Sequence, residues 1–313
     1  MHQEKDGLRQ FLASLVLLGY HLVVAYFLGN IDDQSNLELC KGILDEKLHQ
    51  YPEGVFFLFF KGRYHFIKGQ IPQAKEAYLA SQVSQDQWPQ FHHVCYWELI
   101  WVHQFTRDWW GAAIYANKLL KESKWSKCFY AYQKAAMMCM VQDDLTPEEK
   151  KEQKELMTDV PSLKQKIAGK SLPMEKFAIR KSERFLEQGE FLTLPALELI
   201  YVWNGFKILG KSWDMIEPMY DLVEKSLTQA EAGKDQRKFY KEDLCLLTLL
   251  KGVCLKHMNL PLQAEECFLK VSSHRGVLSR DTYLVPYAMY EQALLLKDQG
   301  ALADALSMLE KTK

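Results

Sequence analysis

The chain has 313 residues, and its 39 lysine and arginine residues nearly balance its 40 aspartate and glutamate residues. This balance excludes the global basic footprint of a nucleic-acid-binding protein, so we expect no nucleic-acid partner. Seven scattered cysteines without a C-x-x-C pair indicate neither a disulfide framework nor a zinc finger, and they are typical of a reducing, cytoplasmic location.

The first predicted element is an apolar helix at residues 11–28, which carries no formal charge. Its length is just enough to raise the hypothesis of a membrane span. Ser14 and His21 near its middle, and the weak basic flank of Lys5 and Arg9, favour a helix that is buried in protein. Membrane association or lipid sensing through this helix is the less favoured alternative.

The rest of the chain is also expected to be helical, because apolar residues recur at three- and four-residue spacing and strand signals are almost absent. Prolines fall near expected helix starts or in connections, and only Pro218 is expected inside a helix. In chain order we expect an apolar helix and a second helix in residues 1–50, repeats in 53–142, a charged irregular connection with helices in 143–190, and further hairpins in 191–313.

The repeats emerge from self-comparison, because residues 59–79 align with residues 249–269 at a constant offset of 190. The alignment pairs Gly62 with Gly252, Gly69 with Asn259, Ala74 with Ala264, and Tyr78 with Phe268. The same frame fits residues 96–116, with Ala112 at the alanine position, and residues 290–309. These spacings resemble the tetratricopeptide repeat, a helical hairpin of about 34 residues. We therefore predict an all-α fold of tetratricopeptide-like hairpins stacked in a right-handed superhelix.

One stretch, GFKILGKS at residues 205–212, matches the P-loop pattern through Gly205, Gly210, Lys211 and Ser212. A working P-loop follows a buried strand and uses small residues whose backbone N–H groups converge on phosphate. Here the middle residues are bulky, the preceding residues have helical spacing, and no magnesium-holding Walker B segment follows. We interpret the match as chance and predict a helix-turn-helix without a bound nucleotide.

The sequence also lacks a convincing metal-binding or catalytic motif. His92, His93 and Cys95 could suggest a metal site, but the two histidines are adjacent, point about 100° apart on a helix, and lack a third ligand at i+4. No common hydrolase or metalloprotease motif stands out. We expect no metal, no cofactor and no enzymatic activity.

The predicted connection is strongly charged, with an acidic run at residues 142–159 and a basic run at residues 164–184. The two runs are solvated or pair with each other in the simpler interpretation; the alternative is a docking patch for an acidic partner. The basic residues that would form this patch are Lys164, Lys166, Lys170, Lys176, Arg180, Lys181 and Arg184.

Three blocks, at residues 90–101 (QFHHVCYWELIW), 166–185 and 194–206, resemble the tetratricopeptide repeat protein 39 family, and the resemblance runs from about Leu8 to the C-terminus. It implies an all-helical repeat scaffold without known catalysis or cofactor, with members loosely associated with lipid metabolism and with cilia. Family members are typically longer than this chain. Neither end carries the polar capping helix expected of a solenoid, so other sequence would be expected to cover the 11–28 helix.

The expected function is that of a non-catalytic adaptor that binds protein partners along its concave face. In tetratricopeptide arrays the first helix of each hairpin lines that face. The predicted partner-binding residues are Phe59, Arg63, Trp97, Trp101, His257 and Tyr290, with Leu249, Val253 and Leu294 beside them. Aromatic residues at these positions favour an apolar or amphipathic peptide. The alternative is that Trp97, Trp101 and Tyr290 are core residues between adjacent hairpins.

Overall fold

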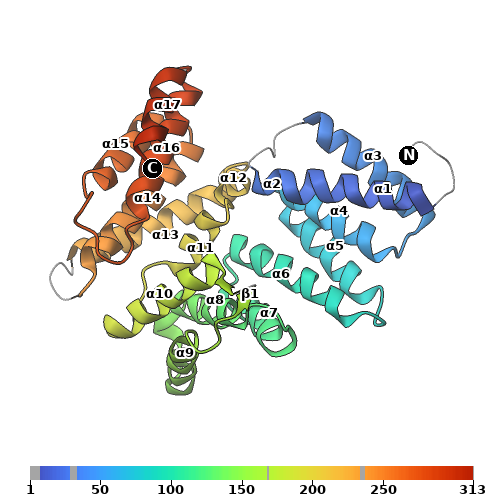
Figure 1. The fold of residues 1–313 in the computed structure, drawn as a ribbon, viewed down its shortest axis with the longest axis horizontal. Coiled ribbons are helices and arrows are strands. Elements are labelled where there is room, and N and C mark those ends of the chain that lie inside the picture. The colour runs from blue at the N-terminus through green and yellow to red at the C-terminus, as the bar shows by residue number, and fades with distance from the viewer. Residues whose placement is uncertain (1–7, 29–33, 168, 233–236, 313) are drawn as a thin grey trace. The chain divides into compact units, whose positions relative to one another are not determined.

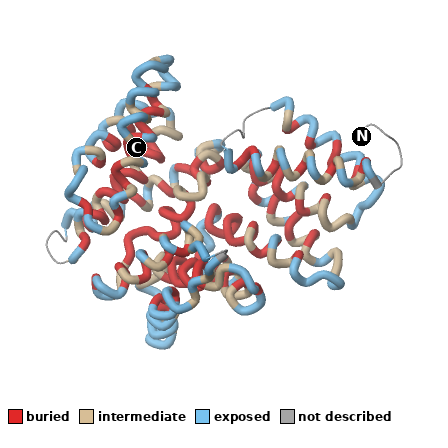
Figure 2. Tube along the Cα trace, in the orientation of Figure 1, coloured by how far each residue is buried: buried red, intermediate tan, exposed pale blue. Residues whose placement is uncertain are grey.

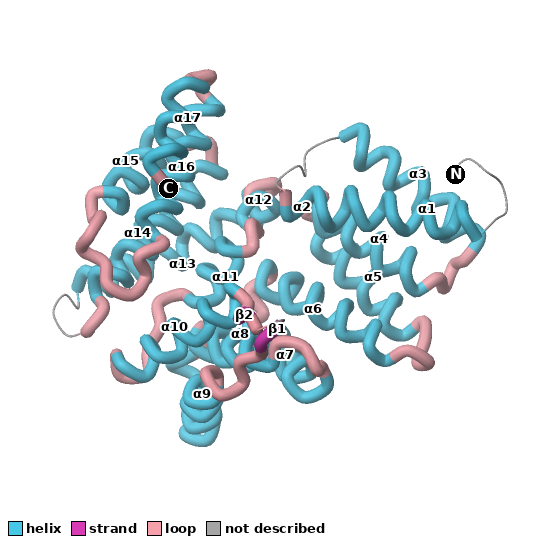
Figure 3. Tube along the Cα trace, in the orientation of Figure 1, coloured by secondary structure: helices cyan, strands magenta, loops and turns pink. Residues whose placement is uncertain are grey.

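The computed structural model describes residues 8–28, 34–167, 169–232 and 237–312, which form two compact units, residues 1–123 and 124–313. Helices dominate both units (Figures 1 and 3), so the predicted all-helical fold is confirmed. The boundary between the units falls inside the predicted 53–142 segment. The four segments are predicted from the repeat pattern of the sequence and not from compactness, so the two compact units do not test them and they stay predictions.

The first unit consists of consecutive helices that pack mainly against their neighbours in sequence. They are α1 (Leu8–Gly19), the π-helical turn η1 (Tyr20–Val24), α2 (Ala25–Phe27), α3 (Gln34–Gln50), α4 (Val55–Ile67), α5 (Ile71–Val83), α6 (Pro89–Phe105) and α7 (Trp109–Glu122).

The second unit continues the helical pattern and contains one short ribbon. Its elements are α8 (Lys127–Cys139), the 3₁₀ turn η2 (Gln142–Asp144), α9 (Pro147–Asp159), β1 (Lys166–Ile167), β2 (Lys170–Ser171), α10 (Pro173–Glu187), α11 (Pro195–Val202), α12 (Phe206–Leu209), α13 (Trp213–Ala232), α14 (Tyr240–His257), α15 (Pro261–Ser272), α16 (Leu284–Asp298) and α17 (Leu302–Lys311). Pro218 lies inside α13, as predicted.

The antiparallel pair β1–β2 departs from the prediction of helices alone. It is only two residues long on each side, and Gly169 between the strands has a φ of +77°. Such a left-handed residue costs glycine little, so a tight reversal forms here without the alternating apolar pattern that signals a longer strand.

Four hairpins end their first helix in the same way. The turn residues Gly69, Arg107, Asn259 and Gly300 all have positive φ, between 58° and 84°. After each, the next backbone N–H donates to the carbonyl five residues earlier, as in Gln70 to His65 at 2.9 Å. This pattern is the Schellman motif, which satisfies carbonyls left unpaired at a helix end. The four turns coincide with the four repeats predicted by self-comparison.

The small residues of the repeat frame allow the two helices of a hairpin to approach closely. A Cβ added at Gly252 on α14 would lie 2.6 Å from the Phe268 ring on α15. A Cβ at Gly62 on α4 would likewise overlap the ring of Tyr78 on α5. The pairing of glycine with aromatic residue, which the alignment of the two segments predicted, is therefore a packing contact that both hairpins share.

The apolar N-terminal segment is helical from Leu8 to Phe27, and Arg9–Phe27 is long and apolar enough to span a membrane by length and composition. Figure 2 shows buried and exposed stretches in turn along this segment, and its fully buried residues include Leu18 and Leu22. Its other side carries an exposed apolar stripe, which consists of Leu12, Val16, Tyr20, Val24 and Phe27. The helix is therefore buried along one face and not all round.

The charged connection is less irregular than predicted, because α10 enters the core of the second unit. Lys181 Nζ lies 2.5 Å from Glu198 on α11 and 2.7 Å from Asp281, which precedes α16. Arg184 pairs with Asp281 and with Asp243 on α14. Buried charges are stable only when they are paired, so this network joins α10 to three later segments.

Candidate functional site

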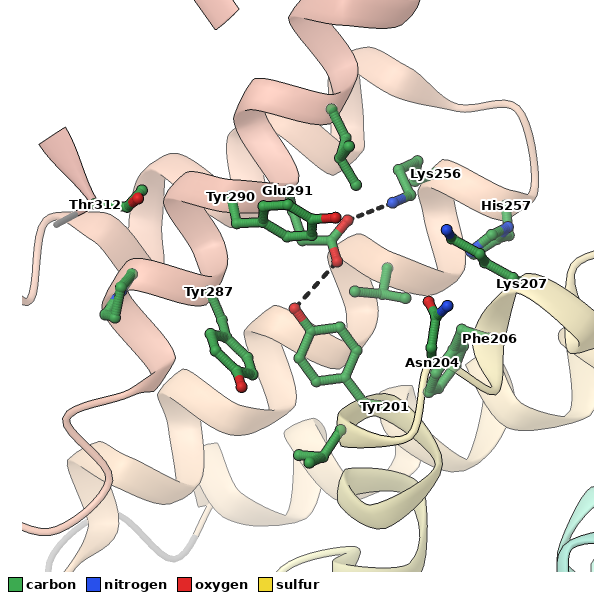
Figure 4. A pocket seen from close by; sticks show the side chains of 14 residues that line it. Tyr201, Asn204, Phe206, Lys207, Lys256, His257, Tyr287, Tyr290, Glu291 and Thr312 are labelled. Carbon is green, nitrogen blue, oxygen red and sulfur yellow. Dashed lines mark hydrogen bonds and ion pairs between the residues drawn. The ribbon is translucent and has the colours of Figure 1, made fainter. Parts of the chain in front are cut away.

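A hollow of the second unit lies where α11, α12, α14 and α16 meet (Figure 4). Its volume is about 480 Å³. The lining residues with polar or aromatic groups are Tyr201, Asn204, Phe206, Lys207, Lys256, His257, Tyr287, Tyr290, Glu291 and Thr312. We call it the C-terminal pocket. A concave site with apolar walls and a few oriented polar groups is the usual form of a ligand site.

At the centre of the pocket wall, Glu291 accepts a hydrogen bond from the Tyr201 hydroxyl at 3.1 Å and forms an ion pair with Lys256. Figure 4 shows the three side chains converging from α11, α14 and α16. Burial, and secondly the Glu291 carboxylate, raise the pKa of Tyr201 well above its ordinary value. The hydroxyl therefore stays protonated as a donor, and the carboxylate stays fixed in place.

Aromatic rings form the walls beside this triad. The rings of Tyr201 and Tyr287 lie 5.9 Å apart in an edge-to-face arrangement, and Tyr287 also packs edge-on against Tyr283 at 5.2 Å. Tyr287 and Tyr290 remain 40% and 45% exposed, so both are open to a ligand. Tyrosine side chains offer large apolar area at low entropic cost, which suits the binding of a peptide.

The opposite wall is shaped by the turn between α11 and α12. Asn204 adopts a φ of +61°, and the N–H of Gly205 donates to the Ile200 carbonyl at 2.8 Å, so α11 ends in the same motif as the repeat hairpins. At the end of α12, a Cβ on Gly210 would overlap the ring of His257. Gly210 thus allows α14 to bring His257 close to this turn.

The P-loop pattern falls on this turn, with α12 between Gly205 and Gly210, and Lys211 and Ser212 after it. The four middle residues are helical, so their N–H groups follow the helix axis instead of converging on one anion. The preceding element, α11, is a helix and not a strand.

Of the six predicted partner-binding residues, the structure brings His257 and Tyr290 together in the C-terminal pocket, with Val253 and Leu294 beside them. His257 lies on α14 and Tyr290 on α16, and each of these helices is the first helix of its hairpin. Their role in binding is untested and stays a prediction.

The other four lie in the first unit and are less accessible than expected for a binding face. Phe59 and Trp101 are buried, and Arg63, 4% exposed, forms an ion pair with the buried Glu98 at 2.8 Å. Trp97 is half-buried and packs edge-on against Trp101 at 5.5 Å. For Trp101 this agrees with the core interpretation. Arg63 is buried because Glu98 neutralises its charge, which sequence spacing alone did not reveal.

The predicted basic patch also contains both exposed and buried residues. Lys164, Lys166, Lys170, Lys176 and Arg180 are exposed, whereas Lys181 and Arg184 are each 1% exposed in the ion-pair network. The basic run therefore contains surface cations and core cations. Helical periodicity separates them, because residues 178, 181 and 185 face inward while 176 and 180 face outward.

Sequence reasoning missed Tyr201, Tyr287 and Glu291. The signal that could have found them is the spacing of Tyr283, Tyr287 and Tyr290, which recur at i, i+4 and i+7 on one side of α16. Tyr201 comes from a helix outside the clear repeats, so no periodic pattern links it to this site.

Comparison with known proteins decides the family. The family profile described as Iml2/Tetratricopeptide repeat protein 39 matches residues 2–258. The chain belongs to the Iml2/tetratricopeptide repeat protein 39 family. The chain is also 37% identical over 306 residues to tetratricopeptide repeat protein ttc-39B of Caenorhabditis elegans.

This member of the family aligns over 96% of its own length with that relative, but it spans about half (51%) of the length of the relative. The family profile ends at residue 258, within the loop after α14. Tyr287, Tyr290 and Glu291 follow that point, whereas Tyr201, Lys256 and His257 lie within the match. The C-terminal pocket therefore combines residues from inside and outside the region that defines the family.

Membership of a repeat-protein family is consistent with a scaffold role and suggests a non-enzymatic one. Among the residues that the structure describes, no group of three or more His, Cys, Asp or Glu side chains is arranged to hold a metal ion. Burial raises the pKa of the Cys40, Cys95 and Cys245 thiols to about 11. Their thiols stay protonated at neutral pH.

Proposed function

We propose that this chain is a non-catalytic adaptor that binds an apolar or amphipathic segment of a partner protein in the C-terminal pocket. The observation that carries the proposal is the placing of His257 and Tyr290, two predicted partner-binding residues, in one open hollow. Tyr287 adds a second half-exposed ring. The buried Glu291 leaves an oriented polar group at the base, where it can accept a hydrogen bond from a peptide.

Proximity labelling in cells tests the proposal with the chain fused to a biotin ligase. In the test variant, Tyr287→Ala and Tyr290→Ala are combined. The matched control combines Trp213→Ala and Leu262→Ala, which truncate exposed side chains of the same unit outside the pocket (52% and 74% exposed). We expect the test variant alone to lose a discrete set of labelled proteins, with helical circular dichroism and melting unchanged in both variants. Equal label profiles for wild type and test variant would refute the pocket as the binding site.

The biological setting we propose follows the family resemblance, namely regulation connected with lipid metabolism or with cilia. The proteins that the test variant loses distinguish the two settings, because they are either lipid-pathway or ciliary components. Loss of neither class would remove this part of the proposal and leave the adaptor function in place.

A second candidate function is association with a membrane surface through the N-terminal helix. The exposed stripe of Leu12, Val16, Tyr20, Val24 and Phe27 favours it, with exposures between 44% and 69%. Since the opposite face packs on α3 and α4, the helix would lie in the interface instead of spanning the bilayer. Flotation with phosphatidylcholine vesicles tests this: Val16→Glu should abolish flotation, whereas Val83→Glu on α5, 76% exposed, should not. A wild-type chain that does not float would refute it.

A further inference from the structure

A group of lysines near the β1–β2 ribbon, all exposed except the half-buried Lys127, shares no residue with the C-terminal pocket. Two segments far apart in sequence meet here. Gln165 donates from Nε2 to the carbonyl of Lys124 at 2.9 Å and accepts from the N–H of Ser126 at 2.8 Å. The loop before β1 is thereby held against the turn that precedes α8.

Glu175, at the start of α10, completes this junction. Its carboxylate accepts from the N–H of Gln165 at 2.9 Å and from the Ser126 hydroxyl at 3.2 Å. Glu175 is fully buried, so its charge is taken up within the junction. Glu175, the neighbour of Lys176 in sequence, therefore does not present its carboxylate to solvent.

Several cations and one exposed aromatic ring lie next to the joined residues in sequence. Trp125 is 64% exposed, and it stands between Lys124 and Lys127. Lys164 and Lys166 flank Gln165 on the loop and β1, and Lys176 follows Glu175 on α10. We call this set, Lys124, Trp125, Lys127, Lys164, Lys166 and Lys176, the ribbon surface.

Opposing charge is scarce at the ribbon surface. No aspartate or glutamate occurs from residue 123 to 142 or from residue 160 to 174. Within the part of the chain that the structure describes, the five lysines of the ribbon surface form no salt bridge, although α9 and the end of α10 have several, such as Lys154 with Glu190 at 2.6 Å. The nearest acids along the chain before these windows are Glu122, two residues before Lys124, and Asp159, five residues before Lys164. Five cations on two joined segments create a local positive potential that attracts an anion.

We propose that the ribbon surface docks an acidic segment of a partner protein that carries an aromatic or aliphatic side chain beside its carboxylates. The lysines supply charge-assisted hydrogen bonds, and Trp125 supplies an apolar anchor at their centre. An anionic bilayer fits less well, because the register places Lys166 and Lys170 on opposite faces of the ribbon, so a planar membrane on the ribbon surface could not also engage Lys170.

The test uses the full chain and fluorescence anisotropy at physiological salt. The probe is a short fluorescein-labelled peptide of aspartate and glutamate with one central phenylalanine. We expect Lys164→Glu, Lys166→Glu and Lys176→Glu together to weaken binding by more than about tenfold. Trp125→Ala should weaken binding by about fivefold or more, and replacing the phenylalanine of the probe by serine should remove the difference between Trp125→Ala and wild type.

The matched control reverses three exposed lysines of the same unit, Lys225, Lys270 and Lys297, and so changes the net charge equally. Binding by this control should equal that of wild type. Equal losses in both triple variants would overturn the proposal, because attraction would then be a property of net charge. No binding of the peptide by wild type would also overturn it.

Two further probes separate the other sources of negative charge. Vesicles of phosphatidylcholine with phosphatidylserine and a single-stranded oligonucleotide are tested with the same variants. Binding of either probe through the ribbon surface in preference to the peptide would assign the surface to lipid or to nucleic acid and overturn the proposal. All substituted lysines are exposed. Unchanged circular dichroism of each variant checks that the fold is kept. A second variant, with Lys164→Gln, Lys166→Gln and Lys176→Gln, is measured in the same way.

Discussion

Arg63 on α4 donates two hydrogen bonds to one backbone oxygen, the carbonyl of Leu22, from Nε at 3.1 Å and from Nη2 at 2.9 Å. Leu22 lies in the π-helical turn η1, where the widened turn disturbs the regular hydrogen bonding of the helix. The third side of the guanidinium pairs with Glu98 on α6 at 2.8 Å. One buried cation thus joins the apolar N-terminal helix to the first two repeat hairpins.

Removing this cation should destabilise the first unit strongly. We expect Arg63→Leu to lower the free energy of unfolding by about 3 to 5 kcal/mol, because Glu98 would remain buried without its counter-charge and with only the hydrogen bond from the Tyr78 hydroxyl at 3.2 Å. The double variant Arg63→Leu with Glu98→Leu should recover much of the loss. Urea unfolding followed by circular dichroism measures both changes. If the double variant were no more stable than the single one, the pairing of the two charges would not be the cause.

Replacement by alanine should lower the stability at the glycines that form helix contacts and raise it at a glycine without such contacts. Gly62→Ala and Gly252→Ala should each cost about 1 to 3 kcal/mol, because the added Cβ meets the ring of Tyr78 or Phe268. Gly42 lies inside α3 with no atom within 4 Å of an added Cβ. Gly42→Ala should therefore stabilise by about 0.5 to 1 kcal/mol. Thermal melting compares the three variants, and a stabilising Gly62→Ala would contradict the close helix approach.

Arg107 is an exposed residue held in the left-handed region, with a φ of 58°, where Gly69 occupies the equivalent turn. We expect Arg107→Gly to raise the free energy of unfolding by up to about 1 kcal/mol, because glycine adopts this conformation without steric cost. Gly69→Ala should lower it by a similar amount. Denaturant titration of the two variants against wild type checks the pair, and equal signs would show that backbone strain does not control these turns.

The buried network of the second unit predicts a specific dependence on pH. Lys181 and Arg184 outweigh the effect of burial and hold the pKa of Asp281 below its ordinary value. A depressed carboxyl pKa stabilises the fold above the unfolded-state pKa near 3.8, and the stability is lost as pH falls through the folded-state pKa. Asp281→Asn should therefore be clearly less stable than wild type at pH 6, and the difference should shrink below about pH 3.8.

The difference between wild type and Asp281→Asn reports the loss of the Asp281 charge together with its effect on Glu198. Burial raises the pKa of Asp243 and of Glu198, so these two carboxyls act in the opposite direction from Asp281, and the charge of Asp281 also raises the pKa of Glu198. Urea titrations at a series of pH values measure the difference. A gap between wild type and Asp281→Asn that stays constant down to pH 3 would mean that the carboxylate charge contributes nothing.

The local features of this chain follow from its sequence. Helix is determined by the three- and four-residue apolar spacing, and three of the four hairpins by a glycine or asparagine turn with a small residue on each side, Arg107 making the fourth turn. Gly62, Gly69 and Tyr78 therefore reappear as contacts and turns where the alignment with residues 249–269 places them. These interactions join residues within about twenty positions of each other, so the pattern that records them is periodic and can be read along the chain.

The C-terminal pocket, the buried ion-pair network and the ribbon surface each depend on residues that no periodic pattern in the sequence links. Tyr201 meets Glu291 across 90 positions, Arg184 meets Asp281 across 97, and Gln165 meets Lys124 across 41. The basic run looked uniform in sequence, yet Lys176 faces solvent and Lys181 is buried between carboxylates of two other segments. Helical periodicity separates the inward from the outward positions of this run, but only the tertiary structure decided which carboxylates neutralise Lys181 and Arg184, because that depends on the approach of distant segments.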